Sequence, residues 1–233
     1  MNENFKIGII GLGYVGFPLA CLFAKKYQVI GYDINEKRIK EINAGIDSTN
    51  EVKAGALEAA LANGMVCTSQ LDDIKPCNVY IVAIPTPVDD FYNPELLPLK
   101  SASTSVGKVL KKGDYVIYES TVYPGVTEEV CAPILEKVSG LKLNEDFYLG
   151  YSPERINPGD RVHTVENIPK ITSGSTPEAA EVIDNLYNSV LLKGTHRAPN
   201  IKVAEAAKIL ENTQRDVNIA FMNEIAVVFN AFG

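Results

Sequence analysis

The segment KIGIIGLGYVG near the start of the chain joins an apolar run to three closely spaced glycines. Residues 6–10 have the composition of a buried strand, and Gly11, Gly13 and Gly16 form the pattern G-x-G-x-x-G in front of a helical stretch. The first glycine of such a pattern permits a tight turn, the second lets the backbone approach a ligand, and the third lets helix and strand pack closely. This order predicts the first unit of a doubly wound α/β sheet.

A second strand, over residues 28–32, is followed by Asp33, 20 residues after Gly13. Unpaired N–H groups and the dipole at a helix start favour an anion, so we expect a dinucleotide pyrophosphate there. The expected contacts are Gly11, Leu12, Gly13, Tyr14, Val15 and Gly16. A glycine turn that only connects strand to helix is the alternative, and the acid after the second strand argues against it.

Asp33 and Arg38 differ in the dinucleotide that they favour. The Asp33 carboxylate can accept both ribose hydroxyls and would repel a 2′-phosphate, which favours NAD over NADP. Arg38, five residues further on, could pair with a 2′-phosphate and is kept as a further cofactor contact. On balance, we expect NAD.

Strand-like and helix-like segments alternate through most of the chain. We predict strands over residues 6–10, 28–32, 65–67, 78–83, 115–118, 147–150 and 170–172. We predict helices over residues 15–26, 36–44, 52–63, 99–111, 125–138 and 177–190. The alternation indicates an α/β fold with a Rossmann-like, doubly wound and mainly parallel sheet over residues 1–198.

Residues 200–232 contain neither proline nor glycine and predict one long helix, which we treat as a separate unit over residues 199–233. The helix carries a broad apolar surface that needs cover. Its last turns contain Ala220, Phe221, Ile225, Val228 and Phe229.

Composition excludes several classes of protein. A net charge of -7 without any basic run argues against a nucleic-acid partner. No apolar run approaches the ~18 residues of a membrane span and no signal peptide precedes the first strand, so we expect a cytoplasmic location. The cysteines lack C-x-x-C spacing and the two histidines are far apart, so we expect no metal centre and small, buried thiols at Cys21, Cys67, Cys77 and Cys131.

Three further strand ends carry polar groups where a doubly wound sheet binds its ligand. The segments VAIPTP, ESTVYPG and YSPERINPGD place there Pro85, Thr86, Ser120, Thr121, Glu154 and Arg155. Hydroxyls after a strand also cap helices, which Ser120 or Thr127 could do instead, and loop charges are often only solvated.

Lys208 and Asn212 lie four residues apart in AEAAKILENT, on one face of the long helix. They form either a solvated stripe or a pair of donors aimed at one substrate oxygen, and spacing alone favours the stripe.

The motifs GLGYVGFPLA, VAIPTP, ESTVYPG, YSPERINPGD and AEAAKILENT, in this order, resemble the UDP-glucose/GDP-mannose dehydrogenase family over essentially all 233 residues. The resemblance implies oxidation of a sugar C6 alcohol to a carboxylate in two NAD-dependent hydride transfers, through an aldehyde, a cysteine thiohemiacetal and a thioester. It implies that Lys208 and Asn212 stabilise the oxyanion, Glu154 assists thioester hydrolysis as a general base, and Thr121 positions water or nicotinamide.

SPERINPGD, KITSGSTPE and ENTQRD more closely resemble the UDP-N-acetylhexosamine 6-dehydrogenase branch, which supplies uronic acids for bacterial surface polysaccharides. Arg155 stands where the UDP-glucose branch carries an aromatic residue, and Pro158 where it carries a second acid. The residues that this resemblance places against the sugar nucleotide are Glu154, Arg155, Ile156, Asn157, Lys208 and Asn212.

Two features of the family have no counterpart in the sequence. The nucleophilic cysteine follows a glycine-rich turn beyond the long helix, and a second domain binds most of the UDP. We therefore expect the chain to be the NAD-binding part of a longer enzyme, inactive alone and dimeric through the long helix. The alternatives are a UDP-glucose or GDP-mannose dehydrogenase, a non-catalytic NAD-binding module, and a hydroxyacid dehydrogenase of the 6-phosphogluconate type, which the SPER loop argues against.

Overall fold

A computed structural model describes residues 4–155 and 165–233. Its eight strands form one sheet in the order β3-β2-β1-β4-β5-β6-β7-β8. The pairs from β3 to β6 are parallel, and β7 pairs with β6 in the antiparallel direction. The predicted Rossmann-like, mainly parallel sheet is confirmed.

The strands are β1 (Lys6–Ile10), β2 (Gln28–Tyr32), β3 (Val66–Thr68), β4 (Val79–Val82), β5 (Tyr115–Tyr118), β6 (Tyr148–Tyr151), β7 (Lys170–Gly174) and β8 (Thr195–Arg197). Strand β8 was not predicted, because three polar and partly exposed residues show no apolar alternation. It is defined by pairing with β7 instead.

The helices are α1 (Gly16–Phe23), α2 (Glu36–Asn43), α3 (Ala54–Ala62), α4 (Leu97–Gly107), α5 (Ala132–Ser139), α6 (Pro177–Asn188) and α7 (Ile201–Phe232). Two shorter turns are the 3₁₀-helix η1 (Leu71–Ile74), which was not predicted, and the π-helix η2 (Val126–Cys131), which begins the segment predicted as an α-helix over residues 125–138.

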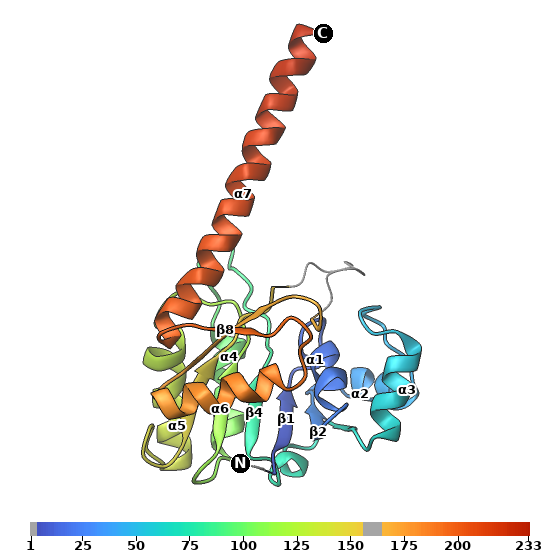
Figure 1. The fold of residues 1–233 in the computed structure, drawn as a ribbon, viewed down its shortest axis with the longest axis vertical. Coiled ribbons are helices and arrows are strands. Elements are labelled where there is room, and N and C mark those ends of the chain that lie inside the picture. The colour runs from blue at the N-terminus through green and yellow to red at the C-terminus, as the bar shows by residue number, and fades with distance from the viewer. Residues whose placement is uncertain (1–3, 156–164) are drawn as a thin grey trace.

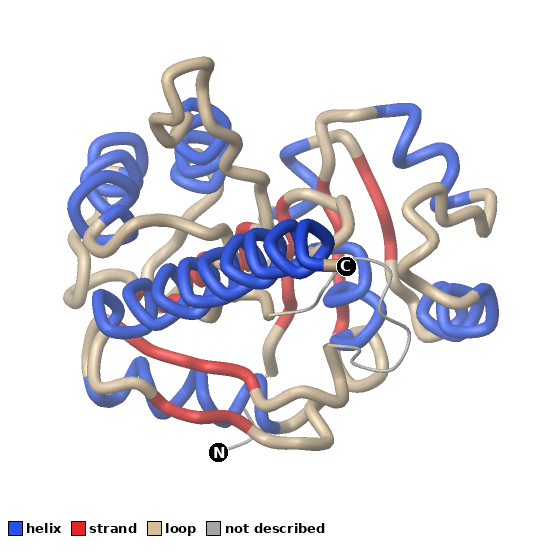
Figure 2. Tube along the Cα trace, turned by 90° about the horizontal axis from the view of Figure 1, so that it is seen from above, coloured by secondary structure: helices blue, strands red, loops and turns tan. Residues whose placement is uncertain are grey.

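Helices cover both faces of the sheet (Figures 1 and 2). Inward residues of α1, α2, α3 and α6 share one buried cluster with Ile9, Ile81 and Ile117 of the central strands. Inward residues of α4, α5 and the first turn of α7 share a second cluster with Tyr80 and Tyr118. Because successive strand residues point to opposite faces, β4 and β5 supply both clusters and are apolar throughout.

Helix α7 is buried only where it begins. Asn200 caps it by accepting a hydrogen bond from the N–H of Val203 at 2.9 Å. The buried residues are Ile201, Ala204, Glu205 and Lys208. Beyond them α7 extends away from the sheet (Figure 1). No helix in residues 4–155 and 165–233 is long and apolar enough to cross a membrane.

Gly16 is the tightest position of the first βα unit. A Cβ at Gly16 would lie 1.9 Å from the carbonyl oxygen of Gly11, whereas a Cβ at Gly55 in α3 meets nothing within 4 Å. We expect Gly16→Ala to abolish cooperative unfolding in urea, because backbone atoms have no room to yield. Gly55→Ala, the matched control, should stabilise the chain by roughly 0.5–1 kcal/mol. A Gly16→Ala variant with an unchanged urea midpoint would contradict this packing.

Candidate functional site

The predicted site residues come from segments that follow β1, β2, β4, β5 and β6 and from the start of α7. These strands are parallel, so the segments that follow them meet at one edge of the sheet, the carboxyl edge. Helix α7 reaches the same edge, because the Glu205 carboxylate contacts the loop that follows β5.

The turn after β1 has the geometry that a dinucleotide requires. Gly11 adopts a φ of +91°, which favours glycine, and Leu12 is buried beneath the turn. Gly13 and Tyr14 are exposed, and a Cβ at Gly13 would meet nothing within 4 Å. The open space above Gly13 and the contact of Gly16 with Gly11 fit the pyrophosphate of a dinucleotide.

The Asp33 carboxylate accepts hydrogen bonds from two backbone N–H groups. They belong to Leu12, at 2.8 Å, and to Asn35, at 2.9 Å. The first bond ties the end of β2 to the glycine turn. Each carboxylate oxygen retains a lone pair, so Asp33 can still accept ribose hydroxyls.

Arg38 lies in a different environment from the one predicted. Its side chain is 8% exposed and pairs with Asp47 at 2.7 Å, and its Nε donates to the carbonyl of Leu12 at 2.9 Å. These contacts occupy the guanidinium inside the protein, over the ring of Phe17. Arg38 therefore supports the glycine turn from inside the protein. Its guanidinium is not available to pair with a 2′-phosphate, contrary to the prediction.

The hydroxyls after β4 and β5 bond to the opposite loop. Thr86 donates to the carbonyl of Thr121 at 2.5 Å, and Ser120 donates to the carbonyl of Ile84 at 2.6 Å. These bonds tie the two loops together and leave the hydroxyl oxygens as acceptors. Thr86 and Thr121 are partly exposed, and Pro85 is exposed. Neither Ser120 nor Thr127 caps a helix through its side chain, since η2 begins without a side-chain cap.

Glu154 and Arg155 follow β6 directly. Glu154 is 7% exposed, accepts the N–H of Arg155 at 2.6 Å and lies 3.7 Å from the ammonium of Lys170. Arg155 donates twice to Glu211 of α7, at 3.1 and 3.2 Å. The predicted contacts Ile156 and Asn157 lie outside the described residues.

Lys208 is buried to 7% exposure at the second turn of α7, and Asn212, one turn later, is half-buried. Burial lowers the pKa of Lys208 below its ordinary value, although the charges of Glu211 and Glu154 raise it in part. Lys208 is thus a poorly hydrated amine under the influence of two carboxylates. A lysine in a solvated stripe would be exposed to water instead.

Glu205, one turn before Lys208, is a site residue that the sequence analysis missed. Its buried carboxylate accepts the N–H of Gly125 at 2.6 Å and of Thr127 at 3.0 Å. It therefore holds α7 against the loop that carries Thr121. An acid on the apolar face of the helix, beside Ala204 and Ile201, was the available signal.

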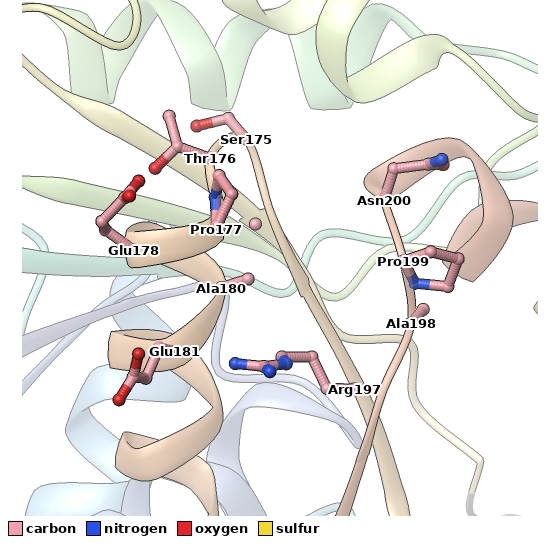
Figure 3. A pocket seen from close by; sticks show the side chains of 11 residues that line it. Ser175, Thr176, Pro177, Glu178, Ala180, Glu181, Arg197, Ala198, Pro199 and Asn200 are labelled. Atoms are coloured by element: carbon pink, nitrogen blue, oxygen red, sulfur yellow. The ribbon is translucent and has the colours of Figure 1, made fainter.

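Two cavities lie away from this edge. One, of about 450 Å³, lies between the starts of α6 and α7, with the Arg197 side chain directed across it (Figure 3). The other, of about 820 Å³, lies beside α1 and α3. The glycine turn, Glu154 and Lys208 line neither cavity, so the open carboxyl edge is the candidate site.

The four cysteines are buried and unbridged, as predicted. Burial raises the pKa of the Cys21, Cys67 and Cys77 thiols to about 12, and that of Cys131 to about 11. These thiols stay protonated and unreactive near neutral pH. Within the described part of the chain, no group of histidine, cysteine and carboxylate side chains could hold a metal ion.

Comparison with known protein families shows to which family the chain is related. Residues 5–191 match the NAD-binding domain of the UDP-glucose/GDP-mannose dehydrogenase family, and residues 202–233 match its central domain. The chain belongs to this family. The domain that carries the glycine turn and Asp33 is accordingly an NAD-binding domain of this family.

Relatives place the chain within that family. It is 59% identical to a UDP-N-acetyl-D-glucosamine 6-dehydrogenase from Pseudomonas aeruginosa, with 99% of this chain and 54% of the relative covered. It is 55% identical to the enzyme of the same name from Salmonella typhi, with 98% and 53% covered. A solved UDP-D-ManNAc dehydrogenase from Pyrococcus horikoshii superimposes with a TM-score of 0.91 at 36% identity, with 98% of this chain and 55% of that chain covered. The chain spans about half the length of these relatives.

The Arg38–Asp47 pair generates a prediction about stability. Burial would raise the pKa of Asp47, but hydrogen bonds from Thr49, Val52 and Arg38 hold it below its ordinary value. We expect Asp47→Asn to lower the free energy of unfolding by about 3–5 kcal/mol at pH 7, because it leaves Arg38 buried without its counter-charge.

The lowered pKa fixes how this loss depends on pH. The stabilisation is complete above the unfolded-state pKa of about 4 and disappears as pH falls through the lower folded-state value. Urea unfolding of wild type and Asp47→Asn at pH 7 and pH 3 should show the difference shrinking at the lower pH. An equal difference at both pH values would argue against an ionised Asp47.

Proposed function

We propose that this chain is the NAD-binding part of a nucleotide-sugar 6-dehydrogenase that oxidises the C6 alcohol of a UDP-N-acetylhexosamine to a uronate, for surface polysaccharide synthesis. The observation that carries the proposal is the burial of Lys208, under the electrostatic influence of Glu154, at the edge that also bears the glycine turn. The names of the two relatives at 59% and 55% identity support a UDP-N-acetylhexosamine, with N-acetylglucosamine as the first candidate.

NAD, when bound, accepts a hydride from the substrate carbon. The turn from Gly11 to Gly16 would hold its pyrophosphate, and Asp33 would accept ribose hydroxyls. Thr86, Ser120 and Thr121 present oxygens on the nicotinamide side, where Thr121 would position water or the nicotinamide.

Lys208 and Asn212 would stabilise negative charge on the substrate oxygen. Both stand on a helix that Glu205 fixes to the neighbouring loop, so little reorganisation is needed when charge develops. In a partly dehydrated site the Lys208 ammonium acts more strongly than in water. Glu154 would serve as a general base, and Arg155, held by Glu211, would contact the sugar nucleotide.

The wider proposal concerns the protein that contains this chain. We propose a NAD-binding domain over residues 1–198, a central helix over residues 199–233, and a remainder that supplies the nucleophilic cysteine and most of the UDP site. We also propose a cytoplasmic location, where UDP-sugars are made.

The full-length protein containing this chain tests the activity. We expect it to produce two NADH for each UDP-N-acetylglucosamine oxidised, measured at 340 nm and by mass spectrometry of the uronate. UDP-N-acetylgalactosamine, UDP-glucose and GDP-mannose form the comparison panel. Faster turnover of UDP-glucose or GDP-mannose would move the protein to another branch of the family.

Two variants separate cofactor binding from catalysis. Gly13→Ala should leave the melting temperature of the ligand-free chain unchanged, because its Cβ enters open space, and should weaken NAD binding about tenfold or more.

Lys208→Ala should leave NAD binding by this chain intact and lower kcat of the full-length enzyme by roughly 10²–10³. Isothermal titration calorimetry and steady-state kinetics measure the two effects. Loss of NAD affinity in Lys208→Ala would exclude the assigned role.

We further propose a homodimer through α7. Val217, Phe221, Val228 and Phe232 recur at helical spacing and are 45–83% exposed, so α7 presents an apolar stripe that needs cover. A stripe along one straight helix suits the self-complementary contact of a two-fold dimer.

The dimer should depend on that stripe. Sedimentation velocity at micromolar concentration is expected to show a dimer for wild type and a monomer for Phe221→Glu/Val228→Glu. Asn223→Glu, a charge added to the opposite side of the same helix, is the control and should stay dimeric. A monomeric wild type, or an unaffected double variant, would exclude α7 as the interface of this chain.

A further inference from the structure

A buried group of charges lies behind Glu154, and the proposed mechanism does not use it. Glu119 follows β5, Lys170 begins β7 and Tyr187 lies in α6. The side chains of Glu119 and Lys170 are 0% and 1% exposed. Lys170 donates to Glu119 at 2.5 Å, and Tyr187 donates to the other oxygen of Glu119 at 2.5 Å.

Lys170 also holds the backbone that leads to Glu154. Its ammonium donates to the carbonyl of Pro153 at 3.1 Å and, at 3.4 Å, to that of Ser152. Together with the bond to Glu119, these contacts hold the ammonium of Lys170 in one position. The residues immediately before Glu154 are thus bonded to a charge fixed in the core.

The charges in this group do not cancel within the Glu119–Lys170 pair. The Lys170 ammonium lies 3.7 Å from a Glu154 oxygen, so two carboxylates share one cation. Burial raises the pKa of Glu119 to about 7, although the neighbouring Lys170 ammonium lowers it in part. Burial would lower the pKa of Lys170, but Glu119 and Glu154 together raise it above its ordinary value.

A buried ion pair contributes little to stability, because removing both charges from water costs about as much free energy as their attraction returns. Replacing a buried ion pair with apolar side chains of similar volume is often neutral or stabilising. The pair is therefore better explained by what it does for the carboxylate beside it. Glu154 lies beside Lys170, accepts the N–H of Arg155, and interacts electrostatically with Glu119 and with Lys208 of α7.

We propose that Lys170, clamped by Glu119, is a positioning residue: it holds the Glu154 carboxylate in place at the carboxyl edge for its step in the reaction. The role of Glu154 in that step rests on the proposed function. The placement of Glu154 by Lys170 rests on the contacts alone.

Kinetics of the full-length protein test the role in the reaction. Lys170→Met should lower kcat about tenfold or more and leave KM for NAD within about threefold, because the backbone that leads to Glu154 loses its anchor. Lys170→Arg keeps the charge and should restore most of kcat. Lys170→Met/Glu119→Gln, which also removes the partner charge, should fold and show the same loss of kcat. A kcat that stays at the wild-type value in both methionine variants, with only the melting temperature lowered, would overturn the proposal.

A second measurement does not depend on activity. In this chain, carbon-13 labelling of the glutamate carboxyl groups reports the surroundings of Glu154, whose signal is identified by its loss in Glu154→Gln. We expect the chemical shift of this signal at pH 7 to change in Lys170→Met/Glu119→Gln and to stay near the wild-type value in Lys170→Arg. An unchanged chemical shift in the double variant would overturn the proposal. A changed chemical shift together with a wild-type enzyme inactive on every nucleotide sugar would uphold the role of Lys170 and remove the proposed function.

Discussion

The close contact between the start of α1 and the turn after β1 is the constraint on which the site depends. Gly16 packs so near the carbonyl of Gly11 that no side chain fits between them. This contact directs the first turn of α1, with its unpaired N–H groups, toward the carboxyl edge. Arg38 and Asp33 then fix the same turn through the carbonyl and the N–H of Leu12. The glycine turn is thus held from three directions before any cofactor binds.

Charge is used differently behind the site and at its surface. The pairs Arg38–Asp47 and Lys170–Glu119 are almost completely buried, and each is surrounded by further hydrogen bonds. Such pairs add little net stability, but breaking one is costly, so they fix geometry more than they stabilise. Among residues 4–155 and 165–233, no ion pair is found for Lys208, whose pKa is lowered by burial; this suits the proposed response of Lys208 to charge on a substrate.

Helix α7 contributes both to the candidate site and to the proposed dimer interface. Its first turns carry Glu205 and Lys208 into the domain, while its later turns present an exposed apolar stripe. Because a continuous helix is stiff, a partner bound to the stripe would also restrain Lys208 relative to the sheet. This coupling offers a physical reason for placing the proposed catalytic amine on the helix that the proposed dimer shares.

The sheet, the glycine turn with Asp33 and the long helix could be predicted from the sequence, because apolar periodicity, glycine spacing and the absence of helix breakers are local signals. Glu154 and Lys208 could be selected as well, through the resemblance of their motifs to a known family. The short strand β8, the internal pairing of Arg38, the bonds from Glu205 to the loop after β5 and the Lys170–Glu119 pair became evident in the folded chain alone. Each of these depends on contacts between residues distant in sequence, such as the 80 positions between Gly125 and Glu205. No local pattern specifies such a partner, because the partner is chosen by how the strands and helices pack.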